Sequence, residues 1–317
     1  MTIATQRFGF SQKIIGLALL AAFGSAHAED DEVAQLIKPE SSVSAGLGIA
    51  SGTGKDRTIF GQYNGLRTND AHLLLDFEIL KRDDATGLWT NIEGRNLGLD
   101  NRELRFSQQK QGDWKYSAEY DQLTRHDLRT INTGLLNAGT ATPTVVSLAA
   151  PGTGADLNLN TKRKSMALGA EKWLTPNLQF EASFKTEDKD GARLFGRGLT
   201  CAAFPNSFNL CGITSTPTGA MLLLPEPINS TTRQFDAKLN YSGEQFMLSG
   251  GYYGSFFTNA NSALSPLVSG NLWNPNGTLL NTGTAPGNTL AGFLQQPMAL
   301  PPENQAHQLY VSGNYAF

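Results

Sequence analysis

Residues 178–185 read LQFEASFK, an unbroken alternation of apolar and polar side chains. Successive side chains of a β-strand point to opposite faces, so this segment predicts a strand with one apolar and one polar face. The same alternation occurs in 114–121 (WKYSAEYD), in 234–241 (QFDAKLNY) and in 72–79 (HLLLDFEI). The chain is therefore expected to be an all-β protein.

Further alternating segments extend this series toward both ends of the chain. Val43–Ile49 begins it and Leu309–Phe317 closes it. Weaker strands are predicted at 88–95, 101–109, 164–173 and 245–256. The pattern predicts about ten antiparallel strands in all.

The expected connections differ in length between the two ends of the strands. Short turns are predicted at 83–87, 109–113, 175–177 and 242–244, and long loops rich in Gly, Pro, Thr and Asn at 122–160, 186–232 and 257–306. Transmembrane β-barrels have this asymmetry, with the short turns in the periplasm. By this count the start of the first strand and Phe317 both lie on the periplasmic side. A soluble β-sandwich is the alternative, but it rarely needs loops this long.

Composition excludes several other classes of protein. The chain has 317 residues, of which 17% are charged, and a net charge of −3, which disfavours a nucleic-acid-binding protein. After the first thirty residues or so, no apolar run approaches the roughly 20 residues of a membrane-spanning helix. A helical membrane protein is therefore excluded.

The amino terminus has the pattern of a secretory signal peptide. Arg7 and Lys13 precede an apolar stretch over 14–23, and Ala26-His27-Ala28 forms a small-x-small cleavage site. We expect residues 1–28 to be removed on export. Residues 29–42 are then a periplasmic amino-terminal segment, and 43–317 form an antiparallel transmembrane β-barrel in the outer membrane of a Gram-negative cell.

The polar side of the alternation predicts which side chains face the barrel lumen. The candidates are charged residues of the three clearest strands: Lys115, Glu119, Asp121, Glu181, Lys185, Asp236 and Lys238. Aromatic residues near the strand ends suit the girdles at the two membrane interfaces, namely Trp114, Tyr120, Trp173, Tyr241 and Phe246. Each lumen candidate also has a simpler interpretation, the hydration of a water-filled lumen.

The sequence carries no recognisable catalytic, cofactor or metal motif. Cys201 and Cys211 share one predicted extracellular loop, and in an oxidising compartment they are expected to form a structural disulfide rather than a redox pair. Neither cysteine belongs to a C-x-x-C-H haem attachment motif, so the chain is expected to carry no haem of its own. His126 and Ser147 are the nearest approach to a hydrolase pair, and nothing in the sequence fixes their geometry.

Several segments, in their order along the chain, resemble the MtrB/PioB family of outer-membrane barrels. They are 60–66 (FGQYNGL), 94–104 (GRNLGLDNREL), 111–116 (QGDWKY) with 120–121, 224–229 (LPEPIN) and 251–259 (GYYGSFFTN). These segments occupy the amino-terminal half of the family pattern, so we expect the chain to be one part of a larger barrel.

The resemblance implies insulation rather than catalysis. The barrel would span the outer membrane, interact with its lipid, and hold a periplasmic multihaem c-type cytochrome that transfers electrons across it. An extracellular cytochrome is a further partner, and the haem belongs to the partners and not to this chain. The alternative function is a porin-like outer-membrane channel with no redox partner.

Overall fold

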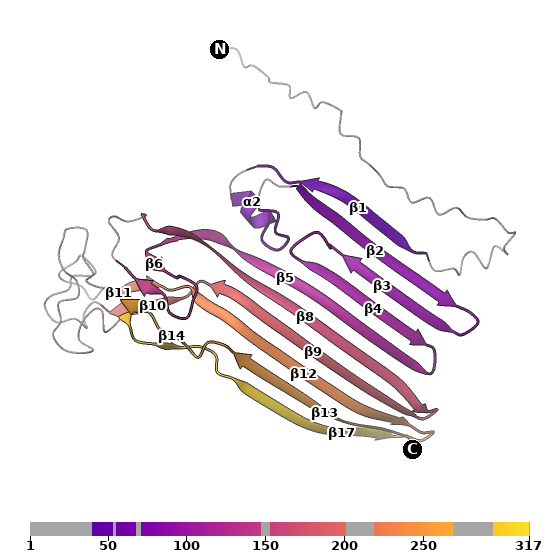
Figure 1. Cartoon of the computed structure of the whole chain (residues 1–317). Helices are drawn as coiled ribbons and strands as arrows, with labels where there is room; N and C mark the ends of the chain where they lie inside the picture. The colour runs from indigo at the N-terminus through magenta and orange to yellow at the C-terminus, as the bar shows by residue number, and fades with distance from the viewer. Residues whose placement is uncertain are drawn as a thin grey trace, which may run out of the picture.

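The computed structural model describes residues 40–52, 55–67, 71–146, 153–200, 219–268 and 294–316. The predicted signal peptide and both cysteines lie outside the described residues. Figure 1 shows one broad, open sheet with a smaller cluster of short strands at one end. Among the described residues, no helix has the length and apolarity needed to cross a bilayer.

The main sheet contains ten strands, and each of the ten predicted strands is confirmed. Every strand pairs antiparallel with its neighbours. In spatial order they are β1 (Ser42–Ile49), β2 (Ala71–Asp83), β3 (Leu88–Arg95), β4 (Arg102–Lys110), β5 (Trp114–Thr133), β8 (Ala155–Thr175), β9 (Leu178–Arg193), β12 (Glu226–Ser242), β13 (Phe246–Asn259) and β17 (Asn304–Tyr315).

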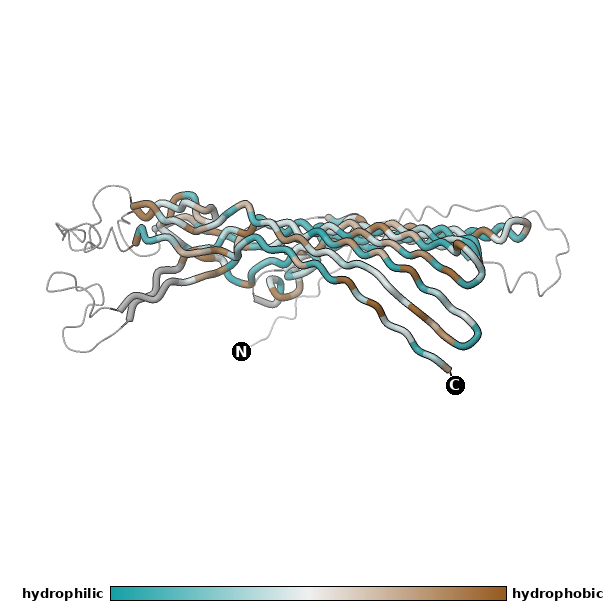
Figure 2. The backbone as a smooth tube through the Cα atoms, turned by 90° about the horizontal axis from the view of Figure 1, so that it is seen from below, coloured by the Kyte–Doolittle hydropathy of each residue, from teal (hydrophilic) through white to brown (hydrophobic). Residues whose placement is uncertain are grey.

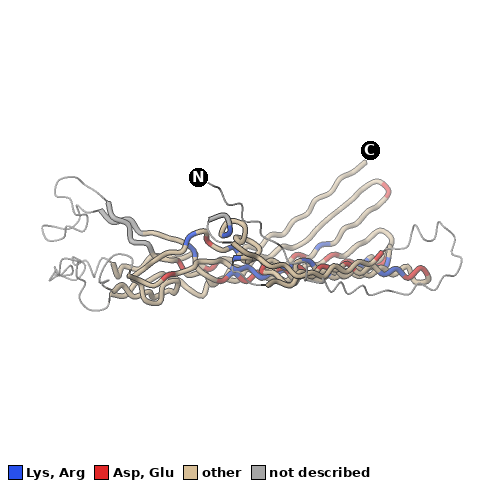
Figure 3. The backbone as a smooth tube through the Cα atoms, turned by 90° about the horizontal axis from the view of Figure 1, so that it is seen from above, with Lys and Arg blue, Asp and Glu red and all other residues tan. Residues whose placement is uncertain are grey.

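The sheet is not closed, so β1 and β17 are its two edges. The strands at the β17 edge bend out of the plane of the others, which gives the sheet a curved cross-section (Figure 3). The antiparallel barrel architecture predicted from the sequence is therefore present as an open, curved wall.

Short turns join the strands at one end, as the sequence predicts. They lie at 84–87, 111–113, 176–177 and 243–245. Gly87 and Gly112 have φ values of 67° and 73°, a left-handed conformation in which glycine avoids the Cβ clash. The amino end of β1 and the carboxyl end of β17 also lie at this short-turn end. The opposite end carries the longer connections, except that β3 and β4 are joined there by residues 96–101 alone.

The strand register separates two kinds of side chain. One row of directly opposed residues, here called the apolar row, runs across eight strands through Ile79, Ile92, Phe106, Ala118, Leu168, Phe184, Phe235 and Gly254. The adjacent row, here called the polar row, runs through Glu78, Glu93, Arg105, Glu119, Ala167, Lys185, Gln234 and Ser255. Adjacent rows face opposite sides of a sheet, so one side is apolar and the other is largely polar.

The apolar face is exposed rather than covered. Leu47, Leu168, Phe235 and Leu309 are 80%, 42%, 40% and 83% exposed. The apolar positions run from Leu178 to Phe184 on β9 and from Phe246 to Phe256 on β13. At roughly 3.3 Å per residue and a tilt of about 40°, such segments cross about 18–28 Å, close to the roughly 25 Å band of an outer-membrane barrel. Figure 2 shows the alternation of hydrophobic and hydrophilic positions along the strands.

Aromatic rings gather at the short-turn end of the apolar face. The ring centroids of Trp114 and Tyr116 are 4.9 Å apart, and those of Tyr241 and Phe246 are 5.1 Å apart. Trp173 does not lie at the predicted girdle position. It is paired with Gln179, which lies on the same side of β9 as Glu181, so Trp173 belongs to the polar side of the sheet.

The predicted loops at 122–160, 186–232 and 257–306 are partly wrong, because the strands continue into them. β5 has 20 residues and β8 has 21, well beyond the apolar row. Past Tyr120, the side of β5 that is apolar in the band carries Gln122 and Thr124. Both faces of the extension are mostly polar, although Leu123 and Leu128 interrupt them, so it suits water rather than lipid.

The long connections form a folded cluster, here called the loop cluster. Its short strands are β6 (Leu135–Leu136), β7 (Thr144–Val145), β14 (Ala263–Leu264), β15 (Leu267–Val268) and β16 (Met298–Ala299), and β10 (Gly196–Thr200) pairs with β11 (Gly219–Leu223). Leu135, Leu224, Leu264 and Leu300 form a buried core there. Loops that are distant in the sequence are therefore held together by apolar packing.

A short helix, α2 (Lys55–Phe60), lies where β2, β3 and β4 end and β5 continues (Figure 1). The turn after α2 is tied to β5, because the His126 amide donates to the Gln62 carbonyl at 2.9 Å and Arg67 donates to the Asp127 carbonyl at 2.7 Å. Gly65 has a φ of 79° and packs against the Asp100 side chain, so a larger residue does not fit there. These contacts hold α2 at the long-connection end of β2, β3 and β4.

Candidate functional site

The register brings all seven sequence-predicted lumen candidates to one face of the sheet. Lys115 opposes Glu171, Glu171 opposes Glu181, and Glu181 opposes Lys238. Glu119 and Lys185 belong to the polar row, and Asp121 and Asp236 lie two positions along their strands from that row, on the same face. This surface is called the polar face below, and charged residues occur along many of its strands (Figure 3).

Arg105 is the centre of a charged group on the β3–β5 part of the polar face. Its guanidinium lies 3.1 Å from Glu119, 3.2 Å from Glu103 and 4.0 Å from Glu93. The contacts with Glu93 on β3 and Glu119 on β5 link three neighbouring strands, whereas Glu103 lies on β4 with Arg105. Glu119 is the only one of the four that the sequence analysis selected as a lumen candidate.

A second group joins β9, β12 and β13. Lys238 Nζ lies 2.9 Å from Glu181 Oε2, and the Asn240 amide donates to Glu181 Oε1 at 2.6 Å. Ser249 in turn donates to Asn240 at 2.8 Å. The polar face therefore holds its charges in hydrogen-bonded groups rather than as isolated side chains.

The remaining candidates have simpler surroundings. Lys115 pairs with Glu171 at 3.7 Å, Asp121 accepts a hydrogen bond from Ser165, and Asp236 accepts one from Tyr310 at 3.4 Å. Within the described residues, Lys185 forms no ion pair.

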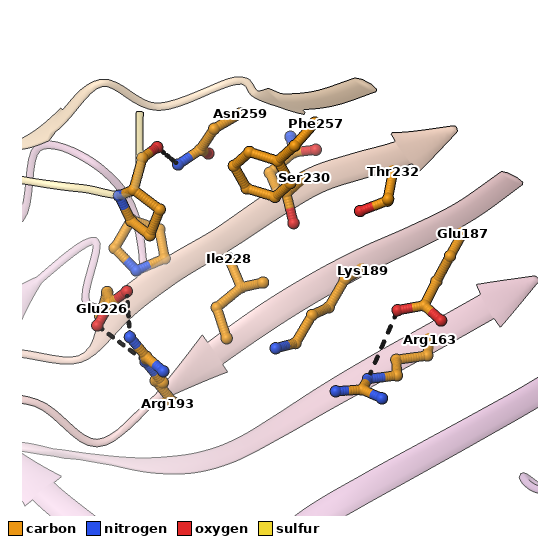
Figure 4. Close-up of a pocket in the computed structure, with 13 residues that line it drawn as sticks. Arg163, Glu187, Lys189, Arg193, Glu226, Ile228, Ser230, Thr232, Phe257 and Asn259 are labelled. Atoms are coloured by element: carbon orange, nitrogen blue, oxygen red, sulfur yellow. Dashed lines mark hydrogen bonds and ion pairs between the residues drawn. The ribbon is translucent and has the colours of Figure 1, made fainter. Parts of the chain in front are cut away.

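A hollow of about 300 Å³ opens on the polar face, on the extensions of β8, β9 and β12 beyond the apolar row (Figure 4). Its charged residues are Arg163, Glu187, Lys189, Arg193 and Glu226. Pro301 lines this hollow and also a second, adjoining hollow that is lined by Leu264 and Leu300 of the loop cluster. The loop cluster thus borders the hollow on one side.

Two carboxylates in the hollow are already paired with arginines. Glu226 is buried, with a side chain 6% exposed, and receives two hydrogen bonds of 2.9 Å from Arg193. Glu187 lies 3.9 Å from Arg163. Burial lowers the pKa of Lys189 below its ordinary value, and the nearby positive charges of Arg163 and Arg193 lower it further.

The hollow was not predicted from the sequence. Its residues lie in segments that the sequence predicted as loops or in a strand end without clear alternation. Lys189 follows Lys185 by four positions, so continued alternation along β9 would have placed both lysines on one face. The four-residue spacing of these lysines was the feature of the sequence that could have indicated the hollow.

The hydrolase pair suggested by the sequence is only partly within the described residues. His126 Nε2 lies 2.9 Å from Asp100 Oδ2, while Ser147, its suggested partner, lies outside the described residues. No group of three His, Cys, Asp or Glu side chains suited to a metal ion occurs among the residues described.

The chain has recognisable relatives among known proteins. A family model described as "Putative outer membrane beta-barrel porin, MtrB/PioB" matches residues 53–317. The chain is also similar to a curated protein of Shewanella baltica (strain OS185), "Outer membrane protein MtrB", with 21% identity over 334 residues. That alignment covers 96% of this chain and 43% of the relative, so the chain spans less than half the length of the relative.

Proposed function

The chain belongs to the MtrB/PioB family of outer-membrane β-barrel proteins, and from this premise we propose that its sheet sheathes a multihaem c-type cytochrome. In this proposal the barrel wall positions the cytochrome for electron transfer across the outer membrane. The partner is periplasmic, and a second, extracellular cytochrome docks at the loop end.

The observation that supports this role most directly is the contrast between the apolar row and the polar row. In a bilayer, backbone groups of a sheet are satisfied by neighbouring strands, and outward side chains meet lipid. The exposed apolar face suits lipid, and the ion pairs of the polar face suit a hydrated protein surface. A folded partner against the polar face then meets charged and hydrogen-bonding groups.

The number of strands limits what the sheet alone can enclose. An eight-stranded barrel has an interior just wide enough for side chains, whereas barrels of about 16 strands or more enclose an aqueous channel. A folded cytochrome therefore requires more strands than the ten of this sheet. The edges β1 and β17 are where additional strands would pair.

The wall contributes insulation and position to electron transfer. The haem groups carried by the partner supply the redox chemistry. The apolar face excludes lipid from the partner, and groups such as Glu181 with Lys238 provide contacts that fix its depth. The ordered loop cluster presents a defined surface at the long-connection end.

Co-purification tests the proposal. The tagged chain, extracted in mild detergent from cells that express multihaem cytochromes, should retain a haem-staining protein of defined stoichiometry. Recovery of the chain without haem protein from such cells would contradict the sheath function. A charge reversal on the polar face, Lys238→Glu, should weaken retention more than a substitution in an exposed short turn, Glu244→Gln.

The alternative function is a porin-like channel, which the hydrated character of the polar face also suits. The two functions differ in conductance, because a barrel filled by a folded partner passes little ionic current. The purified assembly in planar bilayers should therefore show low conductance if the chain is a sheath. A large, stable conductance in the absence of haem protein would favour the channel.

A further inference from the structure

Arg163 and Lys189 oppose each other directly across β8 and β9 in the hollow of the polar face. Like charges in directly opposed positions of a sheet destabilise it. Within the described residues, Lys189 forms no ion pair. The pairing therefore places two positive groups together without a dedicated counterion for the lysine.

The acidic residues of the hollow offset this charge only in part, because Glu187 and Glu226 raise the pKa of Lys189 by less than burial and the two arginines lower it. Arg193 occupies both carboxylate oxygens of Glu226, and Glu187 lies near Arg163. Three cationic side chains thus share the hollow with two paired carboxylates. In Figure 4 the Lys189 amine points into the space between Arg163 and Arg193.

Neutral hydrogen-bonding side chains complete the lining. Ser230 opposes Lys189 across β9 and β12, and Thr232 opposes Glu187 two positions along the strands, on the same face. Both border the hollow, and neither introduces a negative charge. An excess of positive charge beside hydroxyl donors favours an oxyanion, because charge-assisted hydrogen bonds to carboxylate and phosphate oxygens are the stronger ones.

We propose that this hollow is a binding site for an oxyanion, a carboxylate or a phosphate group, held by Lys189 and Arg163 with Ser230 as an additional donor. Lys189 acts as a compact positive charge and Arg163 as a planar donor. A volume of about 300 Å³ accommodates such a group with a small part of the molecule that carries it. The inference goes beyond the sheath function, since it concerns this chain alone.

Amine reactivity measures occupancy of the site directly. The full chain in isolated outer membranes is treated with a trace of an N-hydroxysuccinimide ester, and modification of each lysine is followed by mass spectrometry. Lys185 is the internal reference, because it lies on the same strand and the same face. The lowered pKa of Lys189 leaves more of its amine neutral, so Lys189 should be modified readily when no oxyanion is present.

Addition of inorganic phosphate in one arm and acetate in the other, with chloride replaced to keep ionic strength constant, distinguishes the two oxyanion sources. Saturable loss of Lys189 modification in either arm, with Lys185 unchanged, supports the site and identifies the preferred group. Equal slowing of both lysines, or no change at Lys189 in either arm, overturns it.

The variant Arg163→Gln separates site binding from general screening. It should abolish the protection of Lys189 and slow its modification in anion-free buffer, because a positive neighbour that lowers the lysine pKa is lost. Arg163→Lys, which keeps the charge, should retain faster labelling and part of the protection. Undiminished protection in Arg163→Gln would overturn the assignment to this hollow. All these measurements are independent of whether a haem protein co-purifies.

Discussion

Lys238 Nζ and Glu181 Oε2 lie 2.9 Å apart across β9 and β12, on the face opposite the neighbouring apolar residues Leu239 and Phe180. The same pair of strands therefore presents an ion pair to one side and exposed hydrophobic side chains to the other. This arrangement requires different surroundings on the two sides, which a membrane protein with a hydrated lumen provides.

Introducing a charge on either side tests that difference. Leu168→Arg places a guanidinium in the apolar row, near one end of the apolar band, and should destabilise the membrane-embedded barrel by about 1 kcal/mol, less than the roughly 2–4 kcal/mol expected at the bilayer midplane. Ala167→Arg places the same group in the polar row, between Glu119 and Lys185, and should have a much smaller effect. The folded fraction in outer-membrane preparations, measured by heat-modifiable gel mobility, checks both variants.

The two variants introduce the same side chain at adjacent residues of β8, so they are matched in strand and in depth. Equal loss of folded protein in Leu168→Arg and Ala167→Arg would contradict the assignment of the two faces. Greater loss in Ala167→Arg would reverse it.

The two ends of the sheet are expected on opposite sides of the membrane. In a background lacking Cys201 and Cys211, Arg129→Cys places a thiol on the extension of β5, and Glu244→Cys places one in a short turn. A membrane-impermeant maleimide should label position 129 on intact cells but label position 244 only after the outer membrane is permeabilised. Labelling of position 244 on intact cells would contradict the predicted orientation.

The short turn before β5 provides a pH-dependent contact outside the band. Lys172 donates a hydrogen bond to Asp113 and so lowers the pKa of that carboxyl in the folded protein. A lowered folded-state pKa gives stability that is present above the ordinary carboxyl pKa of about 3.9 and is lost as the pH falls through the folded-state value.

Asp113→Asn should therefore lower the urea midpoint slightly at pH 7, and its difference from wild type should shrink below about pH 4. Glu244→Gln is the control, because this exposed turn carboxylate forms no ion pair within the described part of the chain. A difference between wild type and Asp113→Asn that grows in acid would disprove the stated role of the pair.

The strands within the membrane band were predictable because lipid and water select opposite side chains along them. The alternation in 178–185 identified β9, and the register confirms that Glu181 and Lys185 share its polar face. The lengths of the strands were not predictable in the same way. Beyond Tyr120 and Phe184 both faces are mostly polar, so periodicity no longer distinguishes a strand from a loop.

The hollow and the loop cluster depend on contacts that local pattern does not encode. Arg163 and Lys189 meet only because β8 and β9 continue in register past the band. Leu264 and Leu135 become buried together because separate long connections pack against each other. Short apolar pieces within Gly- and Pro-rich segments give no indication of which other piece they contact.

The loop cluster should be destabilised separately from the sheet. Leu264 is fully buried there, and truncating such a side chain costs about 2–5 kcal/mol through lost packing and the cavity that remains. Leu264→Ala should thus increase protease cleavage in the long connections while the sheet keeps its heat-modifiable mobility. Leu267→Ala is the matched control, because Leu267 is 50% exposed in the same cluster and should have little effect. Equal protease sensitivity of the two variants, or loss of the folded sheet in Leu264→Ala alone, would show that the loop core does not fold as the independent unit inferred from its packing.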